Sequence, residues 1–192
     1  MTAERTVGCS PRTSDWDPDP SIPPGKRAVE KDYAKSGYDI GHMMPNADAR
    51  WDKQVEVDTN VLSNAAPQLP ALNRGPWAVL EERVRIWAVM RRDIIVYTGP
   101  IWNRQAPNVI GSGVVIPVAF YKVVIDPKTR QVLSFIYPAD AKGSPEAFRT
   151  NLAEVQRQTG LILPVPPKST NSRKMWPHAT PATTRTKVCT IK

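Results

Sequence analysis

Histidine and cysteine, the residue types that most often build metal centres, are scarce in this chain of 192 residues, which has two of each. Cys9 and Cys189 stand near opposite ends, and neither has a cysteine or histidine neighbour at zinc-site spacing. A zinc site of the usual pattern is therefore excluded. The two thiols could form one disulfide that joins the ends of the chain, or both could stay reduced.

Long apolar runs are also missing. No stretch of about 18 apolar residues occurs, so the sequence predicts no membrane-spanning helix and no membrane partner. Hydrophobic residues make up 41% and charged residues 23% of the chain, which excludes fibrous and wholly disordered classes. Glycine is half as frequent as proline, 10 against 20, and so many prolines predict numerous loops and extended connections.

Positive charge is concentrated at the C-terminal end. The net charge is +8, and residues 168–192 contain six Lys and Arg residues and no Asp or Glu. The sequence therefore predicts one folded domain over residues 1–167 and a basic, Ser/Thr/Pro-rich tail over residues 168–192. This tail could be a solvated terminus, an electrostatic arm that contacts a polyanion, or a segment that packs on the domain with Trp176 buried.

Hydrophobic periodicity and turn residues predict strands in the middle of the chain, with helices between and after them. Strands are expected at residues 38–44, 94–98, 114–118, 120–125 and 132–137, and an extended segment at residues 55–64. Helices are expected at residues 73–92 and 144–158, the second one closed by Gly160. This order predicts an α+β fold with a mainly antiparallel central sheet and flanking helices.

The helix predicted at residues 73–92 carries two polar residues of interest beside its apolar stripe. The stripe recurs at helical spacing and comprises Trp77, Leu80, Val84, Trp87 and Ala88. Glu81 lies at the edge of this stripe, where a carboxylate is costly unless it is paired or used. It could form an ion pair with Arg85, four residues on, and Asn73 could merely cap the helix.

Of the two histidines, His42 is the better candidate for chemistry. It follows Gly41, a residue that permits close approach of a ligand, whereas His178 lies in the tail and is expected to be solvated. A neutral imidazole can take a proton from water, and an amide oxygen with a carboxylate suits Mg²⁺. Because arginines bind phosphate, His42, Asn73 and Glu81 together predict metal-assisted phosphodiester hydrolysis.

Several short motifs occur in a fixed order. They are Asp39-Ile-Gly-His42, Ser63-Asn-Ala-Ala-Pro-Gln68, Leu72-Asn-Arg-Gly-Pro-Trp77 and Leu80-Glu81. In this order they resemble the DNA/RNA non-specific endonuclease family, the ββα-metal or His-Me finger nucleases, over roughly Arg12 to Gly160. The resemblance implies a ββα-metal active-site motif, with the helix from Asn73 as its α and with Tyr38–Met44 and Val61–Asn64 as its two strands.

The resemblance also implies a role for individual residues. His42 matches the general base, Asn73 matches the one direct protein ligand of Mg²⁺, and Glu81 matches the carboxylate that holds a metal-bound water. Arg85 matches an arginine that contacts phosphate. Mn²⁺ is an alternative to Mg²⁺ at such a site.

Two further positions follow from the same resemblance, and one departs from it. Arg12 matches an upstream phosphate-binding arginine, and Asn64 matches a polar residue near the site. The family's arginine immediately before Gly-His is replaced here by Ile40. In a strand Ile40 and His42 point to the same side, so a phosphate contact is expected to be missing.

The resulting expectation is a Mg²⁺-dependent, sugar-non-specific endonuclease that hydrolyses DNA and RNA to 5′-phosphate products. It would contact phosphates, which position a nucleic acid without specifying its sequence. Ile40 motivates the alternative, a catalytically weakened or inactive homologue that acts as a nucleic-acid-binding protein. A homodimer, and a secreted or periplasmic location without a signal peptide in this chain, are further expectations.

Overall fold

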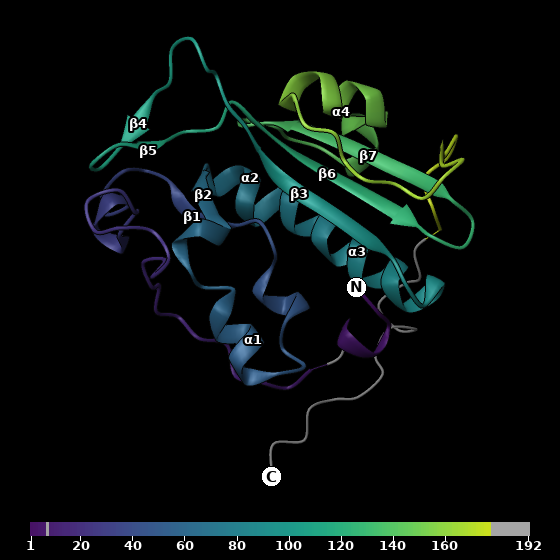
Figure 1. Ribbon diagram of the computed structural model, residues 1–192, viewed down its shortest axis with the longest axis horizontal. Coiled ribbons are helices and arrows are strands. Elements are labelled where there is room, and N and C mark those ends of the chain that lie inside the picture. The colour runs from purple at the N-terminus through teal and green to yellow at the C-terminus, as the bar shows by residue number, and fades with distance from the viewer. Residues whose placement is uncertain (7, 178–192) are drawn as a thin grey trace.

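The computed structural model describes residues 1–6 and 8–177, and its centre is a twisted, mainly antiparallel sheet (Figure 1). The strand order is β3-β6-β7-β8, with β9 added in parallel to β7. These strands are β3 (Ile95–Ile101), β6 (Ala119–Asp126), β7 (Gln131–Pro138), β8 (Arg149–Thr150) and β9 (Thr170–Asn171). The prediction of an α+β fold with a mainly antiparallel sheet is confirmed.

Helices cover both faces of this sheet. Every residue of β6 is buried, as expected for a strand covered on both sides. Helix α3 (Ala78–Arg91) packs on one face through a core that includes Trp77, Trp87 and Phe135, and helix α4 (Leu152–Thr159) packs on the other. Figure 1 shows α4 above the strands and α3 below them. All five residues of the predicted stripe on α3 are buried, as expected.

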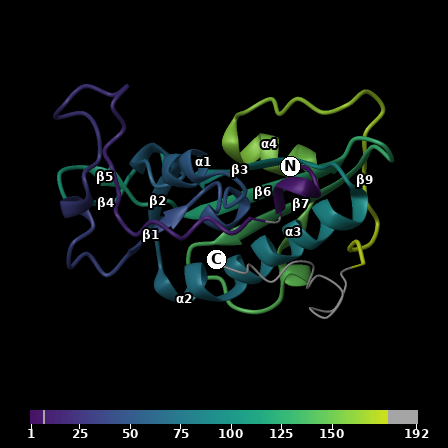
Figure 2. The same ribbon diagram turned by 90° about the horizontal axis from the view of Figure 1, so that it is seen from below.

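A small ββα unit lies on the α3 side of the sheet. Strand β1 (Asp39–His42) pairs antiparallel with β2 (Ala65–Gln68), and the chain then passes through α2 (Pro70–Leu72) and the π-helical turn η5 (Asn73–Trp77) into α3. Figure 2 shows this run from β2 through α2 to α3. The backbone at Gly75 (φ −111°, ψ −117°) is not helical, so the predicted single helix is kinked where it begins.

The extended segment predicted at residues 55–64 is wrong. Residues Lys53–Asp58 form helix α1, and the Asp52 carboxylate caps it by accepting from the backbone N–H groups of Gln54 and Val55. Val55, Val57 and Val61 suggested a strand, but the N-cap and the burial of Glu56 select a helix, because local propensity yields to such interactions. The second strand of the ββα unit is consequently β2 rather than Val61–Asn64.

Two other boundaries also differ. Strand β3 continues through Gly99 and Pro100 instead of ending there, because β3 pairs only with β6 and an edge strand tolerates proline. The strand predicted at 114–118 shortens to β5 (Val114–Val115), which pairs with β4 (Val109–Ile110) in a separate hairpin.

The second predicted helix is interrupted. The turn η6 (Pro145–Phe148) and strand β8 precede α4, which begins after Asn151, whose side chain accepts from the N–H of Glu154. Gly160 closes α4 in the left-handed conformation, φ 73°, as predicted. The remaining short helical turns are η1 (Glu4–Thr6), η2 (Glu30–Asp32), η3 (Asn46–Asp48) and η4 (Leu62–Asn64).

Part of the predicted tail packs against the domain. Strand β9 joins the sheet, and Trp176 is only 3% exposed, with its ring 5.5 Å from the ring of Trp87. The division predicted at residue 167 therefore does not separate packed chain from tail. His178 and Cys189 lie outside the described part of the chain, so the choice between a Cys9–Cys189 disulfide and two reduced thiols stays open. Among the described residues, no helix is long and apolar enough to cross a membrane.

Candidate active site

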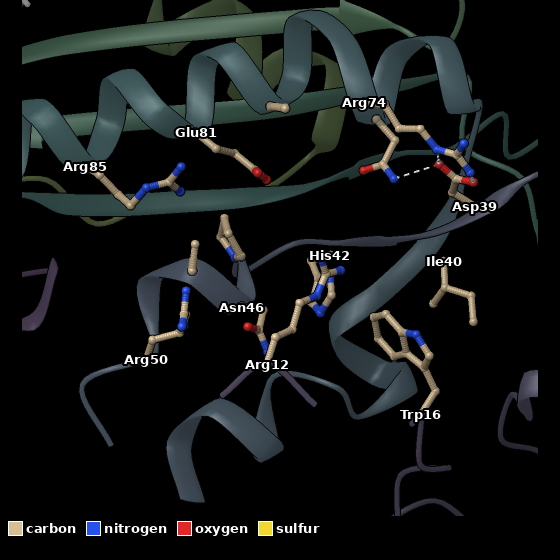
Figure 3. A pocket seen from close by; sticks show the side chains of 14 residues that line it. Arg12, Trp16, Asp39, Ile40, His42, Asn46, Arg50, Arg74, Glu81 and Arg85 are labelled. Atoms are coloured by element: carbon tan, nitrogen blue, oxygen red, sulfur yellow. Dashed lines mark hydrogen bonds and ion pairs between the residues drawn. The ribbon is translucent and has the colours of Figure 1, made fainter. Parts of the chain in front are cut away.

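A cavity of about 670 Å³ opens between the β1 end of the ββα unit and helix α3. Four arginines, Arg12, Arg50, Arg74 and Arg85, line it together with His42, Asn46, Asn73 and Glu81. Figure 3 shows Glu81 and Arg85 descending from one helix, with His42, Asn46 and Arg12 on the opposite wall. The structure thus brings five of the six predicted site residues to one place, and Asn64 is the exception.

His42 ends strand β1, where a close backbone approach is built in. Gly41 pairs with Ala66, and a Cβ on Gly41 would lie 2.3 Å from Oε1 of Gln68, so any larger residue would displace this strand. The His42 ring lies 4.4 Å from the ring of Trp16. Burial lowers the pKa of His42, and Arg12 adds to this effect, although Asn60 and Glu56 act in the opposite direction. The neutral imidazole that a general base requires is therefore favoured.

The hydrogen bond that His42 makes to Asn60 fixes which nitrogen of His42 carries the proton. The Nδ2 group of Asn60 donates to the carbonyls of Thr13 (2.9 Å) and Asp15 (3.1 Å). Its Oδ1 therefore faces Nε2 of His42, 2.9 Å away, and can only accept. Nε2 must then be the protonated nitrogen of neutral His42, which leaves the lone pair on Nδ1.

Asn73 is oriented by a carboxylate rather than acting as a helix cap. Its Nδ2 donates to Oδ2 of Asp39 at 2.9 Å, and no side-chain cap bond precedes α3. Arg74 binds the same carboxylate in a bidentate manner at 2.6 and 2.8 Å, as Figure 3 shows. Although burial raises the pKa of Asp39, hydrogen bonds from Arg74 and Asn73 outweigh burial and lower it. Since the Asn73 amide nitrogen is committed to Asp39, the oxygen is its remaining group for a ligand.

The surroundings of the Glu81 carboxylate disfavour its ionised form. Burial raises the pKa of Glu81 to about 7, and Asp48 adds to this effect, whereas Lys122 and Arg85 lower it. The anticipated Glu81–Arg85 ion pair is not among the ion pairs of the described residues. Arg85 instead contacts Asp48 at 3.1 Å. Two partly exposed carboxylates, Glu81 and Asp48, thus share two cations, and a further cation in the cavity would stabilise the ionised form of Glu81.

The donor set fits a magnesium ion. An amide oxygen from Asn73 and a carboxylate from Glu81 are hard oxygen ligands, and Mg²⁺ takes few protein ligands while keeping several waters. Among the described residues, no group of three or more His, Cys, Asp or Glu side chains could hold a metal.

Asn64 and Ile40 contribute no polar group to the arginine-lined cavity. The Asn64 side chain holds the segment after β1 by hydrogen bonds. It accepts from the Met44 N–H and donates to the Met44 and Thr59 carbonyls. It therefore supports the strand that bears His42 and does not line the cavity. Ile40 lines the cavity but packs with Trp16 in an apolar cluster, so this end of the cavity offers no phosphate contact of its own.

Several residues of the site were not anticipated as such, and Arg74, which binds Asp39, is one of them. Asp39 stands inside the recognised motif but had no assigned role, while Arg50, Asn46 and Asn60 carried no signal beyond their polarity. Nε of Arg50 donates to the Ser10 carbonyl at 2.7 Å, a contact across forty residues. Only the folded chain brings such pairs together, so sequence spacing could not reveal them.

Comparison with known proteins agrees with this geometry. Residues 2–167 match the family described as DNA/RNA non-specific endonuclease. The chain is 32% identical to human mitochondrial endonuclease G over 167 residues, covering 79% of this chain and 56% of that protein. It is also 32% identical to a nuclease of Serratia marcescens over 168 residues, covering 80% of this chain and 62% of that protein.

A solved structure supports the fold in the same way. The structure of an EndoG/EndoGI complex matches with a TM-score of 0.78 and 30% identity, covering 85% of this chain and 75% of that chain. The chain spans little more than half of human endonuclease G and about three fifths of the Serratia nuclease. The match over residues 2–167, together with the ββα unit and its cavity, shows that this chain belongs to the DNA/RNA non-specific endonuclease family.

Proposed function

We propose that this protein is a Mg²⁺-dependent endonuclease that hydrolyses phosphodiester bonds of DNA and RNA without regard to the sugar. The observation that carries the proposal is the joint placement of His42, Asn73 and Glu81 in one arginine-lined cavity. The names of the relatives, an endonuclease and a nuclease, agree with this activity.

His42 is the general base in this proposal. Nδ1 holds the lone pair because Nε2–H is bound to Asn60, so Nδ1 takes a proton from a water molecule that attacks phosphorus. Proton transfer to a positioned base contributes roughly 10²–10⁴-fold to the rate. The imidazolium that forms is stabilised by its bond to the Asn60 oxygen.

Asn73 and Glu81 would hold the metal ion, Asn73 directly and Glu81 through water. Bound Mg²⁺ supplies Lewis-acid stabilisation of the charge that develops on the phosphate and on the departing 3′ oxygen. Departure of the 3′ oxygen leaves the phosphate on the 5′ side, so the products would carry 5′-phosphates.

The arginines would hold the phosphates of the substrate. Guanidinium groups bind phosphate through paired hydrogen bonds, and Arg12 and Arg85 reach the cavity from opposite walls (Figure 3). Phosphate contacts are the same for every base and for both sugars, which supports action on DNA and RNA alike. A homodimer remains a separate prediction.

Ile40 supports a second candidate, a relative that binds nucleic acid and cleaves it weakly or not at all. Incubation of supercoiled plasmid with the purified protein, with Mg²⁺ and with EDTA, decides between the two. Nicking that depends on Mg²⁺ supports the enzyme. Binding of plasmid in a gel-shift assay without any nicking would support the binding protein.

A further inference from the structure

Glu56 of helix α1 is a buried carboxylate that the proposed mechanism does not use. Its side chain is 0% exposed. Oε1 accepts from the Thr13 N–H (2.6 Å) and from Nδ2 of Asn46 (2.6 Å), while Oε2 accepts from the Thr13 hydroxyl (2.8 Å) and from Nζ of Lys53 (2.8 Å). All four partners are donors, so only an ionised carboxylate can satisfy them. Burial raises the pKa of Glu56, but these hydrogen bonds outweigh burial and lower it to about 2.

The first path from Glu56 to the cavity runs through Thr13 to His42. Glu56 binds both the backbone N–H and the hydroxyl of Thr13, and the Thr13 carbonyl accepts from Nδ2 of Asn60. That bond turns the Asn60 oxygen toward Nε2 of His42. Thr13 also directly follows Arg12, which lines the cavity. The Glu56 carboxylate thus holds the Thr13 segment in place. This segment orients Asn60, which determines which nitrogen of His42 carries the proton.

The second path runs through Asn46, which is only 6% exposed. Its Nδ2 lies near three acceptors, the Glu56 carboxylate, the Glu56 carbonyl (3.4 Å) and the Thr59 hydroxyl (3.1 Å). Its Oδ1 accepts from no described residue, although Asn46 lines the cavity. Figure 3 shows Asn46 on the same wall as His42 and Arg12. An acceptor there cannot bind a phosphate oxygen, and it suits the O–H of a water molecule.

We infer that Glu56 is a positioning residue of the active site, which fixes the tautomer of His42 through Thr13 and Asn60 and aims the oxygen of Asn46 into the cavity. Its effect on catalysis rests on the proposed function, because it acts on the base named there. Its effect on the His42 tautomer is independent of any activity, since the hydrogen bonds alone determine it.

The decisive experiment compares Glu56→Gln with Lys53→Met. The glutamine keeps the shape of the side chain, but its N–H₂ group cannot accept a hydrogen bond. It faces either the Thr13 N–H and Nδ2 of Asn46 or Nζ of Lys53 and the Thr13 hydroxyl, so two of the four bonds must be lost or reversed. Lys53 is 54% exposed. Its replacement removes its bonds to Glu56, to the Thr13 hydroxyl and to the Pro11 carbonyl, but it leaves the bonds of Glu56 to Thr13 and Asn46 in place. Both variants are tested for melting temperature, for plasmid cleavage, and by ¹⁵N NMR of the histidine rings, with His178→Ala used to assign the two signals.

The wild-type protein and Lys53→Met should show His42 protonated on Nε2 when neutral, and Glu56→Gln should show a mixture of tautomers. Turnover of Glu56→Gln should fall by roughly 100-fold, the loss that small misplacements of catalytic groups cause, with KM changed much less. An unchanged tautomer and unchanged turnover in folded Glu56→Gln would overturn the inference.

Two further outcomes are separable. If Glu56→Gln does not fold, Asn60→Ala removes the last link of the first path, and an unshifted His42 tautomer in that variant would overturn the inference. If the wild-type protein never nicks plasmid, the proposed function fails, and the NMR comparison still tests the positioning role.

Discussion

The two walls of the cavity differ in how completely their polar groups are satisfied. The base wall consists of Arg12, Thr13, His42, Asn46, Glu56 and Asn60, and the helix wall consists of Glu81 and Arg85 on α3 with Asp48 and Lys122 behind them. In the base wall every oxygen of the Glu56 carboxylate has two donors. In the helix wall burial and the neighbouring Asp48 leave Glu81 with a pKa of about 7.

This difference indicates two different tasks. The hydrogen bonds around Glu56, Thr13 and Asn60 are already formed and need no rearrangement during a reaction, so they keep His42 in one tautomer and one orientation. A carboxylate whose ionised form is disfavoured by desolvation is costly on its own, and another cation that arrives beside it stabilises that ionised form. We therefore read the base wall as preorganised without a ligand, and the helix wall as completed only when a metal ion binds.

The largest expected effect comes from removing the base itself. His42→Ala should lower turnover by about 10²–10⁴-fold, the share that a positioned base contributes. KM should change little, because phosphate binding rests on the arginines. Steady-state kinetics on plasmid or a short duplex measures both values. His178→Ala is the matched control and should retain wild-type turnover; equal losses in the two variants would contradict the assignment of His42.

A change in the helix wall should act on the metal rather than on the base. Asn73→Ala removes the proposed direct ligand and should weaken Mg²⁺ binding by about 10–100-fold, judged from the cost of perturbing metal-site residues. Titration of activity against Mg²⁺ and calorimetry of Mg²⁺ binding measure this shift. The ¹⁵N signals of His42 should stay as in the wild type. Undiminished activity with unaltered Mg²⁺ dependence would show that Asn73 is not the ligand.

The pH dependence of cleavage reports on the base wall. Only neutral His42 can accept a proton, so kcat/KM falls as the pH drops through the His42 pKa. Because burial holds that pKa below its usual value of 6.5, activity should persist to a lower pH than an exposed histidine allows. A pH–rate profile at saturating Mg²⁺ locates the midpoint of the acidic limb. A midpoint above 6.5 would mean that His42 is not buried as a neutral base.

The smallest expected effect concerns the apolar end of the cavity. Ile40→Arg should restore a phosphate contact and lower KM about five-fold, since an exposed charged contact is worth about 1 kcal/mol. Turnover should change less than KM, because the base and the metal ligands are untouched. Ile40→Lys distinguishes a bidentate contact from charge alone. A KM that rises in both variants would show that the apolar contact with Trp16 matters more than the added charge.

Particular elements show where sequence reasoning succeeds. Strands β6 and β7 were located to within one or two residues, because long β-branched and aromatic runs separated by an Asp-Pro turn leave little choice. Every residue of the predicted apolar stripe is buried, because helical spacing defines one face, although the stripe omitted Ile86, which is buried as well. His42, Asn73 and Glu81 were recognised because their motifs are local and occur in order along the chain.

The failures have an equally physical origin. The valines around Glu56 favoured an extended segment, but the Asp52 side chain caps a helix there. The Glu56 carboxylate on this helix binds Thr13, more than forty residues earlier in the chain. The Glu81–Arg85 pair had suitable helical spacing, yet Arg85 turned to Asp48, on a different element. For Trp176 the sequence left a solvated tail and a packed segment open, and the burial of its ring in the core selects the packed segment.

The sequence by itself determined the α+β class, the order of the motifs and the chemistry of the side chains that meet in the cavity. These properties depend on local sequence patterns, which do not change with the contacts between distant parts of the chain. The tertiary structure decided which partner each polar group received, and hence the tautomer of His42, the orientation of Asn73 and the charge state favoured at Glu81. Hydrogen bonds and burial set these properties, and both depend on residues that are distant in sequence and adjacent only after folding.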